Sequence, residues 1–344
     1  MSTGAGIALA SALLFGLSAP IAKILVGGID PWVLAGLLYC GAGGGLFLWR
    51  LVAGSTSEAK LARADLPWLA GAVACGGIAA PVLLMTGLAR IDAAPASLLL
   101  TLEGVFTALL AWFVFRENFD RRIALGMLAI VAGAVALNWA PVEARIDPWG
   151  AGAIALACLA WALDNNITRK ISLADPVQIA AIKGAIAGPT ALAIGLAAGA
   201  SLPGAGASFA ALTTGFLGYG ASLALFILAL RHLGTARAGA YFSTAPFVGA
   251  LVSVPLLGES VTAGLVLAGG LMALGVWLHL SERHEHEHAH PEMAHEHRHS
   301  HDEHHDHPHD PGVDPRAPHS HFHVHKPLRH VHDHAPDPHH RHTH

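Results

Sequence analysis

AAPASLLLTLEGVFTALLAWFVFRE, residues 93–117, has a second copy later in the chain, ARAGAYFSTAPFVGALVSVPLLGE at residues 236–259. At an offset of 142 residues the two copies align from end to end, so that Glu117 meets Glu259. Self-similarity at a fixed spacing indicates two copies of one structural unit. Each copy is apolar over about the 20 residues that a helix needs to cross a bilayer. The sequence therefore predicts a membrane protein built from a repeat.

The composition of the whole chain points the same way. Of its 344 residues 53% are hydrophobic and only 13% are charged, whereas about 25% are charged in an ordinary soluble domain. This excludes a soluble enzyme and a nucleic-acid-binding protein. The fold class that we predict is an all-α membrane protein with ten transmembrane helices. Their expected ranges are 4–26, 32–53, 67–89, 93–115, 122–140, 149–168, 176–199, 208–230, 236–257 and 261–280.

The spans divide into two five-helix repeats, at 1–140 and 141–280. Because five is odd, the second repeat should enter the membrane upside down relative to the first, as in many secondary transporters, whose substrate site lies between the repeats near mid-membrane. Alternate loops carry ten basic residues against two in the remaining loops. Since basic loops stay inside, both termini are predicted to be cytoplasmic. We expect a monomer in the inner (plasma) membrane of a bacterial-type cell.

A family resemblance rests on the two repeated stretches together with Phe15-Gly16, Pro20 and Lys23 in the first span. These residues resemble the EamA-type permeases of the drug/metabolite transporter superfamily over residues 1–280. The resemblance implies a ten-helix carrier that moves small organic solutes by alternating access and requires no cofactor. It does not fix the substrate.

The chain departs from this family pattern at two positions. Similar proteins usually have a proline early in the fourth span, where Pro246 lies in the second half, but the first half has Glu103-Gly104 instead. Similar proteins often have a basic residue in the second span, and here that position holds Leu38 in the first half and Lys183 in the second. The charges expected in the cavity are therefore particular to this chain.

Four charged residues lie inside predicted spans, and such charges usually face a cavity or a partner. Glu103 is near mid-span, where it could carry a proton or cation, contact a cationic substrate, or only form a structural hydrogen bond. Asp164 and Lys183 lie at equal distances from the loop between the sixth and seventh spans, so we expect an ion pair at one depth, either functional or only joining two helices. Lys23 is close to the outer end of its span, and its side chain is expected to extend outward to the interface.

Other side chains complete the candidate cavity. Asn165 and Asn166 could supply hydrogen bonds beside the expected ion pair. Trp161 and Tyr241 lie deep in their spans and could line the cavity, although ordinary packing is the favoured explanation for both. The candidate substrate or coupling residues are Lys23, Glu103, Trp161, Asp164, Asn165, Asn166, Lys183 and Tyr241.

The C-terminal segment, residues 281–344, has too few apolar residues to form a core and is predicted to be a disordered cytoplasmic tail. It contains 23 of the 25 histidines. Neutral imidazole is a ligand for Zn, Ni, Co and Cu, and nearby carboxylates could complete the coordination. A solvated, pH-sensitive tail with incidental metal affinity is the alternative. The candidate metal ligands are His284, His286, His288, His290, His295, His297, His299, His301, His304, His305, His307, His309, His319, His321, His323 and His325.

Two functions remain open on this basis. The first is export of a small metabolite across the inner membrane by alternating access, coupled to protons or a cation, with a tail that binds metal. The alternative is efflux of Zn, Ni, Co or a metal chelate, with the tail collecting ions. An enzyme is not expected, because the spans contain no pattern typical of a nucleophile and its base or of a phosphate-binding loop.

Overall fold

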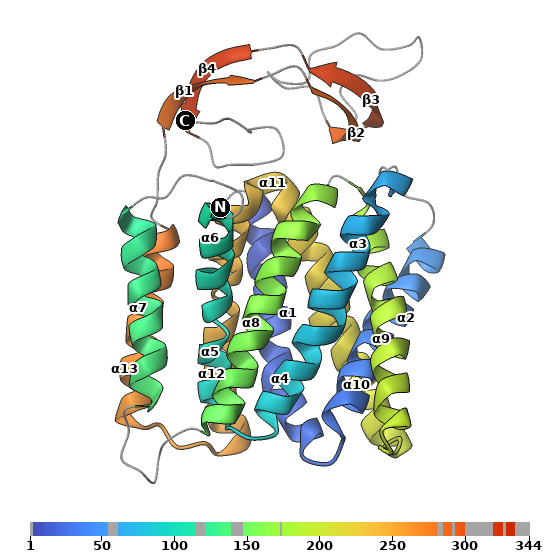
Figure 1. The fold of residues 1–344 in the computed structure, drawn as a ribbon, viewed down its shortest axis with the longest axis vertical. Coiled ribbons are helices and arrows are strands. Elements are labelled where there is room, and N and C mark those ends of the chain that lie inside the picture. The colour runs from blue at the N-terminus through green and yellow to red at the C-terminus, as the bar shows by residue number, and fades with distance from the viewer. Residues whose placement is uncertain are drawn as a thin grey trace.

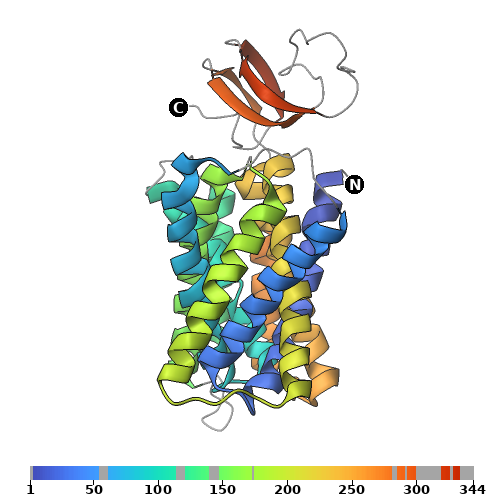
Figure 2. The same ribbon diagram turned by 90° about the vertical axis from the view of Figure 1, so that its right-hand side faces the viewer.

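The computed structural model describes residues 3–53, 61–113, 121–138, 147–172 and 174–280, and in the tail 285–290, 293–299, 319–325 and 328–333. Within these residues, ten helical runs form one elongated bundle (Figures 1 and 2). Six of the described runs are long and apolar enough to cross a membrane: Gly4–Val26, Pro31–Val52, Arg63–Leu88, Ala93–Leu110, Pro176–Ala197 and Ala205–Leu230. The prediction of an all-helical membrane bundle is confirmed.

Six of the runs are single uninterrupted helices, each close to a predicted span. Buried apolar side chains from all of them join one continuous core. They are α1 (Thr3–Val26), α2 (Pro31–Ala53), α7 (Arg121–Asn138), α8 (Pro148–Thr168), α9 (Pro176–Ala197) and α13 (Ala263–Leu280).

Two runs contain a π-helical segment that the sequence did not predict. The third run has η1 (Arg63–Asp65) and α3 (Leu66–Ala72), then a π-helix, η2 (Val73–Ala79), and then α4 (Ala80–Leu88). In the eighth run, α10 (Ala205–Thr214) is followed by a second π-helix, η5 (Gly215–Ala221), and by α11 (Ser222–Phe242). The two π-helices are separated by the same 142 residues as the repeated sequences. π-segments are rare and occur mostly at functional sites.

The fourth span is interrupted in both halves. In the first half α5 (Ala93–Leu99) ends before residues 100–101 and α6 (Leu102–Phe113) follows; in the second half α11 ends before residues 243–244 and α12 (Ala245–Leu257) follows. The predicted loop between spans 208–230 and 236–257 is corrected here, because α11 continues through residues 231–235. No proline interrupts its backbone hydrogen bonds before Pro246.

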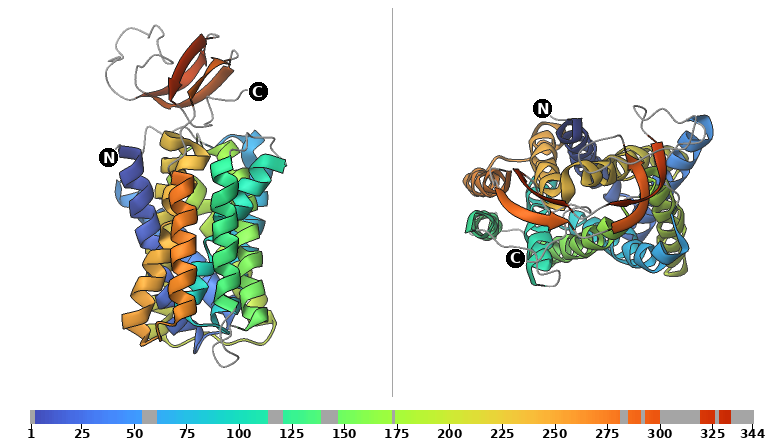
Figure 3. Two further views of the ribbon diagram at one scale, coloured as in Figure 1. Left: turned by 90° about the vertical axis from the view of Figure 1, so that its left-hand side faces the viewer. Right: turned by 90° about the horizontal axis from the view of Figure 1, so that it is seen from above.

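Glycines allow helices of the two halves to approach closely. In the contact between α2 and α9, a Cβ atom on Gly43 would overlap the backbone of Gly184 and Ala185, and one on Gly188 would overlap that of Cys40. Close approach through small residues is the usual packing between membrane helices. At one side of the bundle α7 packs against α13 (Ala263–Leu280), which pairs the last span of each half (Figures 1 and 3).

Two charged side chains satisfy the backbone at helix ends. The Lys23 ammonium donates to the carbonyls of Leu88, at 2.8 Å, and Ile91, at 2.6 Å. The carboxylate of Glu259 accepts from the amides of Ala93 and Ala94, at 2.7 and 2.8 Å. The Lys23 side chain thus reaches the end of α4 and the turn that follows it, and its extension to the membrane interface stays a prediction. The end of a helix leaves carbonyls without partners, and the ammonium is held there.

The histidine-rich segment contains four short strands. β1 (Glu285–His290) pairs with β4 (Leu328–Asp333), and β2 (Met293–His299) with β3 (His319–His325), both antiparallel. The prediction of a disordered tail does not hold for these stretches, whose alternation of histidine with other residues has the two-residue period of a strand. The candidate ligands His284, His301, His304, His305, His307 and His309 lie outside the described residues.

Candidate functional site

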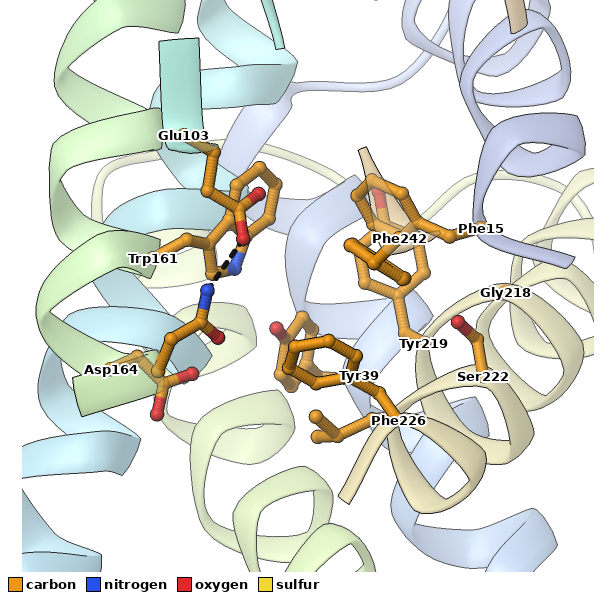
Figure 4. Close-up of a pocket in the computed structure, with 12 residues that line it drawn as sticks. Phe15, Tyr39, Glu103, Trp161, Asp164, Gly218, Tyr219, Ser222, Phe226 and Phe242 are labelled. Carbon is orange, nitrogen blue, oxygen red and sulfur yellow. Dashed lines mark hydrogen bonds between the residues drawn. The ribbon is translucent and has the colours of Figure 1, made fainter. Parts of the chain in front are cut away.

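A cavity with about 450 Å³ of empty space lies between the two halves of the chain. Side chains from α1, α2, α6, α8, η5 and α11 line it, and Figure 4 shows them converging from several helices. The first half contributes Phe15, Tyr39 and Glu103, and the second half contributes the remainder. Those residues are Trp161, Asp164, Asn165, Gly218, Tyr219, Ser222, Leu223, Phe226 and Phe242.

Glu103 reaches this cavity because the interruption at residues 100–101 places it in the first turn of α6. The chain remains turned between α5 and α6, since the amides of Glu103 and Gly104 donate to the carbonyls of Leu100 and Thr101. One oxygen of Glu103, Oε1, accepts a hydrogen bond from the Asn165 amide at 2.7 Å (Figure 4). The pair therefore joins α6 of the first half to α8 of the second.

Next to Asn165 on α8, Asp164 forms the ion pair that the sequence predicted. The Lys183 ammonium lies 2.7 Å from Oδ1 and 2.6 Å from Oδ2 of Asp164, and the Thr168 hydroxyl donates to Oδ1 at 2.9 Å. Lys183 is 1% exposed and Asp164 is 4% exposed. Because Lys183 binds both oxygens of Asp164, the charge of this carboxylate is neutralised within the protein.

The π-helix η2 supports the wall of the cavity through a single carbonyl. The oxygen of Gly76 accepts from the Tyr39 hydroxyl at 2.6 Å and from the Trp161 indole at 3.2 Å. Both polar groups are therefore engaged with the backbone. Gly76 also lies against Asp164, since a Cβ atom at this position would overlap the Asp164 carboxylate.

We expect Gly76→Ala to destabilise the protein by about 1–3 kcal/mol, the usual cost of overpacking, because the added methyl group displaces the Asp164 carboxylate. Gly152→Ala in α8 is the matched control, since a Cβ atom there meets no atom within 4 Å. The stability of both variants can be compared by the midpoint of their thermal aggregation in detergent. A Gly76→Ala midpoint equal to that of Gly152→Ala would contradict the steric argument.

Aromatic rings form a continuous cluster around the cavity. The Phe15 ring centroid lies 5.6 Å from that of Trp161, 5.7 Å from Tyr219 and 5.3 Å from Phe242. Tyr39 lies 5.5 Å from Tyr219 by the same measure. Because Phe15 and Trp161 occupy matching positions in the two repeats, the cluster crosses the boundary between the halves.

Not every residue of the predicted site faces this cavity. Trp161, Glu103, Asp164 and Asn165 line it, and Lys183 is held behind Asp164. Asn166 instead donates to the Ala162 carbonyl within α8. Tyr241 is not among the lining residues and packs against a small apolar cluster that includes Ala8 and Phe226, and Lys23 is at the end of α4.

Sequence reasoning missed most of the aromatic wall. It did not select Tyr39, Tyr219, Phe226 or Phe242, nor the neighbouring Ser222. The Ser222 hydroxyl donates to the carbonyl of Ser11 at 2.9 Å, and Ser11 donates to the carbonyl of Ser222 at 2.7 Å, so the two side chains join α1 to α11. The offset of 142 does map Gly76, whose carbonyl supports the cavity wall, onto Gly218, which lines the cavity.

Among the side chains that the structure describes, no group of three histidine, cysteine or acidic residues is arranged to hold a metal ion. The chemistry that the cavity offers is that of a carboxylate, an amide and aromatic rings. These groups bind a small molecule by charge, hydrogen bonding and ring contact.

Comparison with known proteins matches both halves of the chain to one family model. The EamA-like transporter family model matches residues 2–139 and again 148–281. An "Uncharacterized transporter" of Methanothermobacter thermautotrophicus is 28% identical over 284 residues, which are 77% of this chain and 82% of the relative.

Two further comparisons are narrower. One matches a part of the sequence, and the other concerns the fold. A "Probable 4-amino-4-deoxy-L-arabinose-phosphoundecaprenol flippase subunit ArnE" of Pseudomonas paraeruginosa is 43% identical over 90 residues, 26% of this chain and 75% of that protein. One solved structure, described only as "Crystal structure of protein", has a TM-score of 0.64 at 18% identity, over 81% of this chain and 96% of that chain. This last similarity concerns the fold alone.

Proposed function

Because this chain belongs to the EamA-like transporter family, and is therefore a membrane transporter and not an enzyme, we propose that it exports a small metabolite by alternating access. The ten helices act as two inverted five-helix repeats, and the substrate binds between them. A proton or a cation provides the coupling through Glu103. We further propose that the protein works as a monomer in a bacterial-type inner membrane.

The observation that carries this proposal is the cavity shared by the two halves. It contains Glu103 from one repeat hydrogen-bonded to Asn165 from the other. A contact across the repeat boundary must change when one repeat moves against the other, and substrate sites of inverted-repeat transporters lie at such boundaries. The π-helix η5 lines the cavity, and η2, at the corresponding position of the first repeat, supports its wall through Gly76. We expect helix bending at these two segments.

Metabolite profiling of cells that produce the protein tests the proposal. Leu223→Trp fills the cavity, which Leu223 lines, whereas Leu217→Trp adds the same bulk at a 44% exposed position outside the cavity lining. We expect at least one small metabolite to accumulate outside cells that produce wild type or Leu217→Trp, and not outside cells with Leu223→Trp. Identical profiles for the wild type and Leu223→Trp would refute the export function.

The proposed orientation has both termini in the cytoplasm. It is supported by the ten basic residues in one set of loops against two in the other. In intact cells, we expect an impermeant thiol reagent to label a cysteine introduced at Gly28, in the loop after α1, and to leave one introduced at Thr235 or in the tail unlabelled. Labelling of the tail from outside would reverse the orientation.

For the tail, we propose binding of divalent transition ions such as Zn, Ni, Co or Cu. The strand register supports this, since it places His286 opposite His332 and His288 opposite His330. Residues two apart in a strand share a face. The second sheet pairs histidines in the same way, at His295–His323, His297–His321 and His299–His319.

We expect calorimetry on the full chain to detect several zinc ions per molecule at pH 7.5, and none on a chain truncated before His284. Binding should weaken strongly at pH 5, because imidazole protonates around pH 6 and then cannot coordinate a metal. Equal zinc binding by the truncated chain, or unchanged binding at pH 5, would contradict the metal role. If truncation also lowered metal efflux from cells, the alternative function of a transition-metal exporter would be favoured.

A further inference from the structure

The two carboxylates that line the cavity, Asp164 and Glu103, differ in whether a cation neutralises them. Asp164 is neutralised by Lys183, which binds both of its oxygens. Within the described residues, the partner of the Glu103 carboxylate is the neutral Asn165 amide, which donates a hydrogen bond to it. No lysine, arginine or histidine is among the residues that line the cavity. The cavity therefore has one carboxylate without a cationic partner in its lining.

The aromatic rings around the cavity are suited to a cationic ligand, as is the Glu103 carboxylate. Phe15, Trp161, Tyr219 and Phe242 surround the space beside Glu103 (Figure 4). The face of an aromatic ring carries negative charge density and attracts cations, most strongly when water is excluded. The polar groups of Tyr39 and Trp161 are held by the Gly76 carbonyl, so these two residues offer the ligand mainly their rings.

We propose that the cavity binds a compact organic cation, an ammonium group attached to an apolar body. This rests on the proposed transport function and names the substrate class. The ammonium group donates to the Glu103 carboxylate, and the apolar body contacts the rings of Phe15 and Phe242. An anionic solute finds no counter-charge there, because Lys183 is occupied by Asp164 and Lys23 is bound to carbonyls at the end of α4.

The size of the cavity limits the apolar body. The roughly 450 Å³ of empty space includes space that is open to solvent, so the enclosed part is smaller. We therefore restrict the proposed ligand to one aromatic ring with a short aminoalkyl chain. Tyr219 lines this space with its ring, while its hydroxyl is buried.

Three probes of nearly equal shape test this inference on the purified full-length protein. Phenethylammonium is the cation, 2-phenylethanol is the neutral analogue and 3-phenylpropionate is the anion. We expect calorimetry to find the cation bound at least about tenfold more tightly than either analogue, since a charge-assisted hydrogen bond contributes more than a neutral one. Equal affinity for the alcohol, or preference for the propionate, would overturn the inference without any mutation.

Two variants with matched controls identify the groups responsible. Glu103→Gln should weaken phenethylammonium binding at least about tenfold. Glu259→Gln replaces a carboxylate outside the cavity and should leave the affinity unchanged. Phe15→Leu should weaken binding several-fold through the lost ring, while Phe209→Leu, 72% exposed, should have no effect. Unchanged binding in Glu103→Gln would exclude this carboxylate as the recognition group.

These results separate the inference from the transport function. If phenethylammonium binds as expected but metabolite profiles do not respond to Leu223→Trp, the export function fails and the cation site stands. If export depends on Leu223 and the exported metabolite is an anion or a neutral molecule, the export function stands and the cation site fails.

Discussion

Replacing Lys183 with methionine, or Asp164 with asparagine, should destabilise the protein by about 3–5 kcal/mol, while the double replacement should be far less damaging. Each single change leaves one charge buried without its partner, at positions that are 1% and 4% exposed. The double change leaves none, and both new side chains have nearly the original shape. We would measure the yield of monodisperse protein and the midpoint of its thermal unfolding in detergent.

The control for this cycle is Thr168→Val. It removes only the hydrogen bond from its hydroxyl to the Asp164 carboxylate, which should cost about 1.5–3 kcal/mol. A double mutant as unstable as the sum of the two single mutants would mean that Asp164 and Lys183 do not interact energetically. That outcome would leave their close contact as a consequence of packing between α8 and α9.

The sequence identified the charged part of the site and missed the aromatic part. Glu103, Asp164 and Lys183 stand out because charges inside a membrane span are costly and rare. Aromatic residues do not stand out, since the same side chain packs in the core, faces lipid or lines a cavity. Tyr241 was selected and Phe242 was not, yet Phe242 lines the cavity and Tyr241 packs elsewhere. One residue along a helix changes the direction of a side chain by about 100°, and no pattern in this sequence determines the rotation of α11.

The spans were predictable to within a few residues because their length is set by the thickness of the bilayer. The π-helices η2 and η5 were not, because an α-helix and a π-helix of the same residues differ only in hydrogen-bond register. Tertiary contacts select the register here. Gly76 lies against Asp164, and a Cβ atom on Gly218 would overlap the Ser18 side chain. Both contacts join a π-helix to a residue distant in sequence.

The partners of Lys23 were not predictable either, because they also depend on tertiary contacts. Its distance from the end of its span allowed an extended side chain that reaches the interface. Its actual partners, the carbonyls of Leu88 and Ile91, lie on another run of the bundle.

Glu103→Gln should reduce transport strongly and leave stability almost unchanged, which is the opposite of the Lys183 result. Glutamine keeps the shape of glutamate and can still accept the hydrogen bond from Asn165, so we expect less than about 1 kcal/mol of destabilisation. It cannot carry a proton or a negative charge. Loss of a charge-assisted contact worth about 1.5–3 kcal/mol should raise the substrate concentration needed for half-maximal transport roughly ten- to hundredfold.

Flux into proteoliposomes at several pH values measures this effect once the exported metabolite is identified. Wild-type flux should depend on pH, and the flux that remains in Glu103→Gln should not, because coupling through this carboxyl group requires it to bind and release a proton. Glu259→Gln is the matched control, since Glu259 accepts two backbone N–H bonds at the start of α5 and lies outside the cavity. It should lose stability and keep pH-dependent flux. Undiminished pH-dependent flux in Glu103→Gln would show that another residue provides the coupling. Asp164, which is paired with Lys183, would then be the other carboxylate of the cavity lining to test.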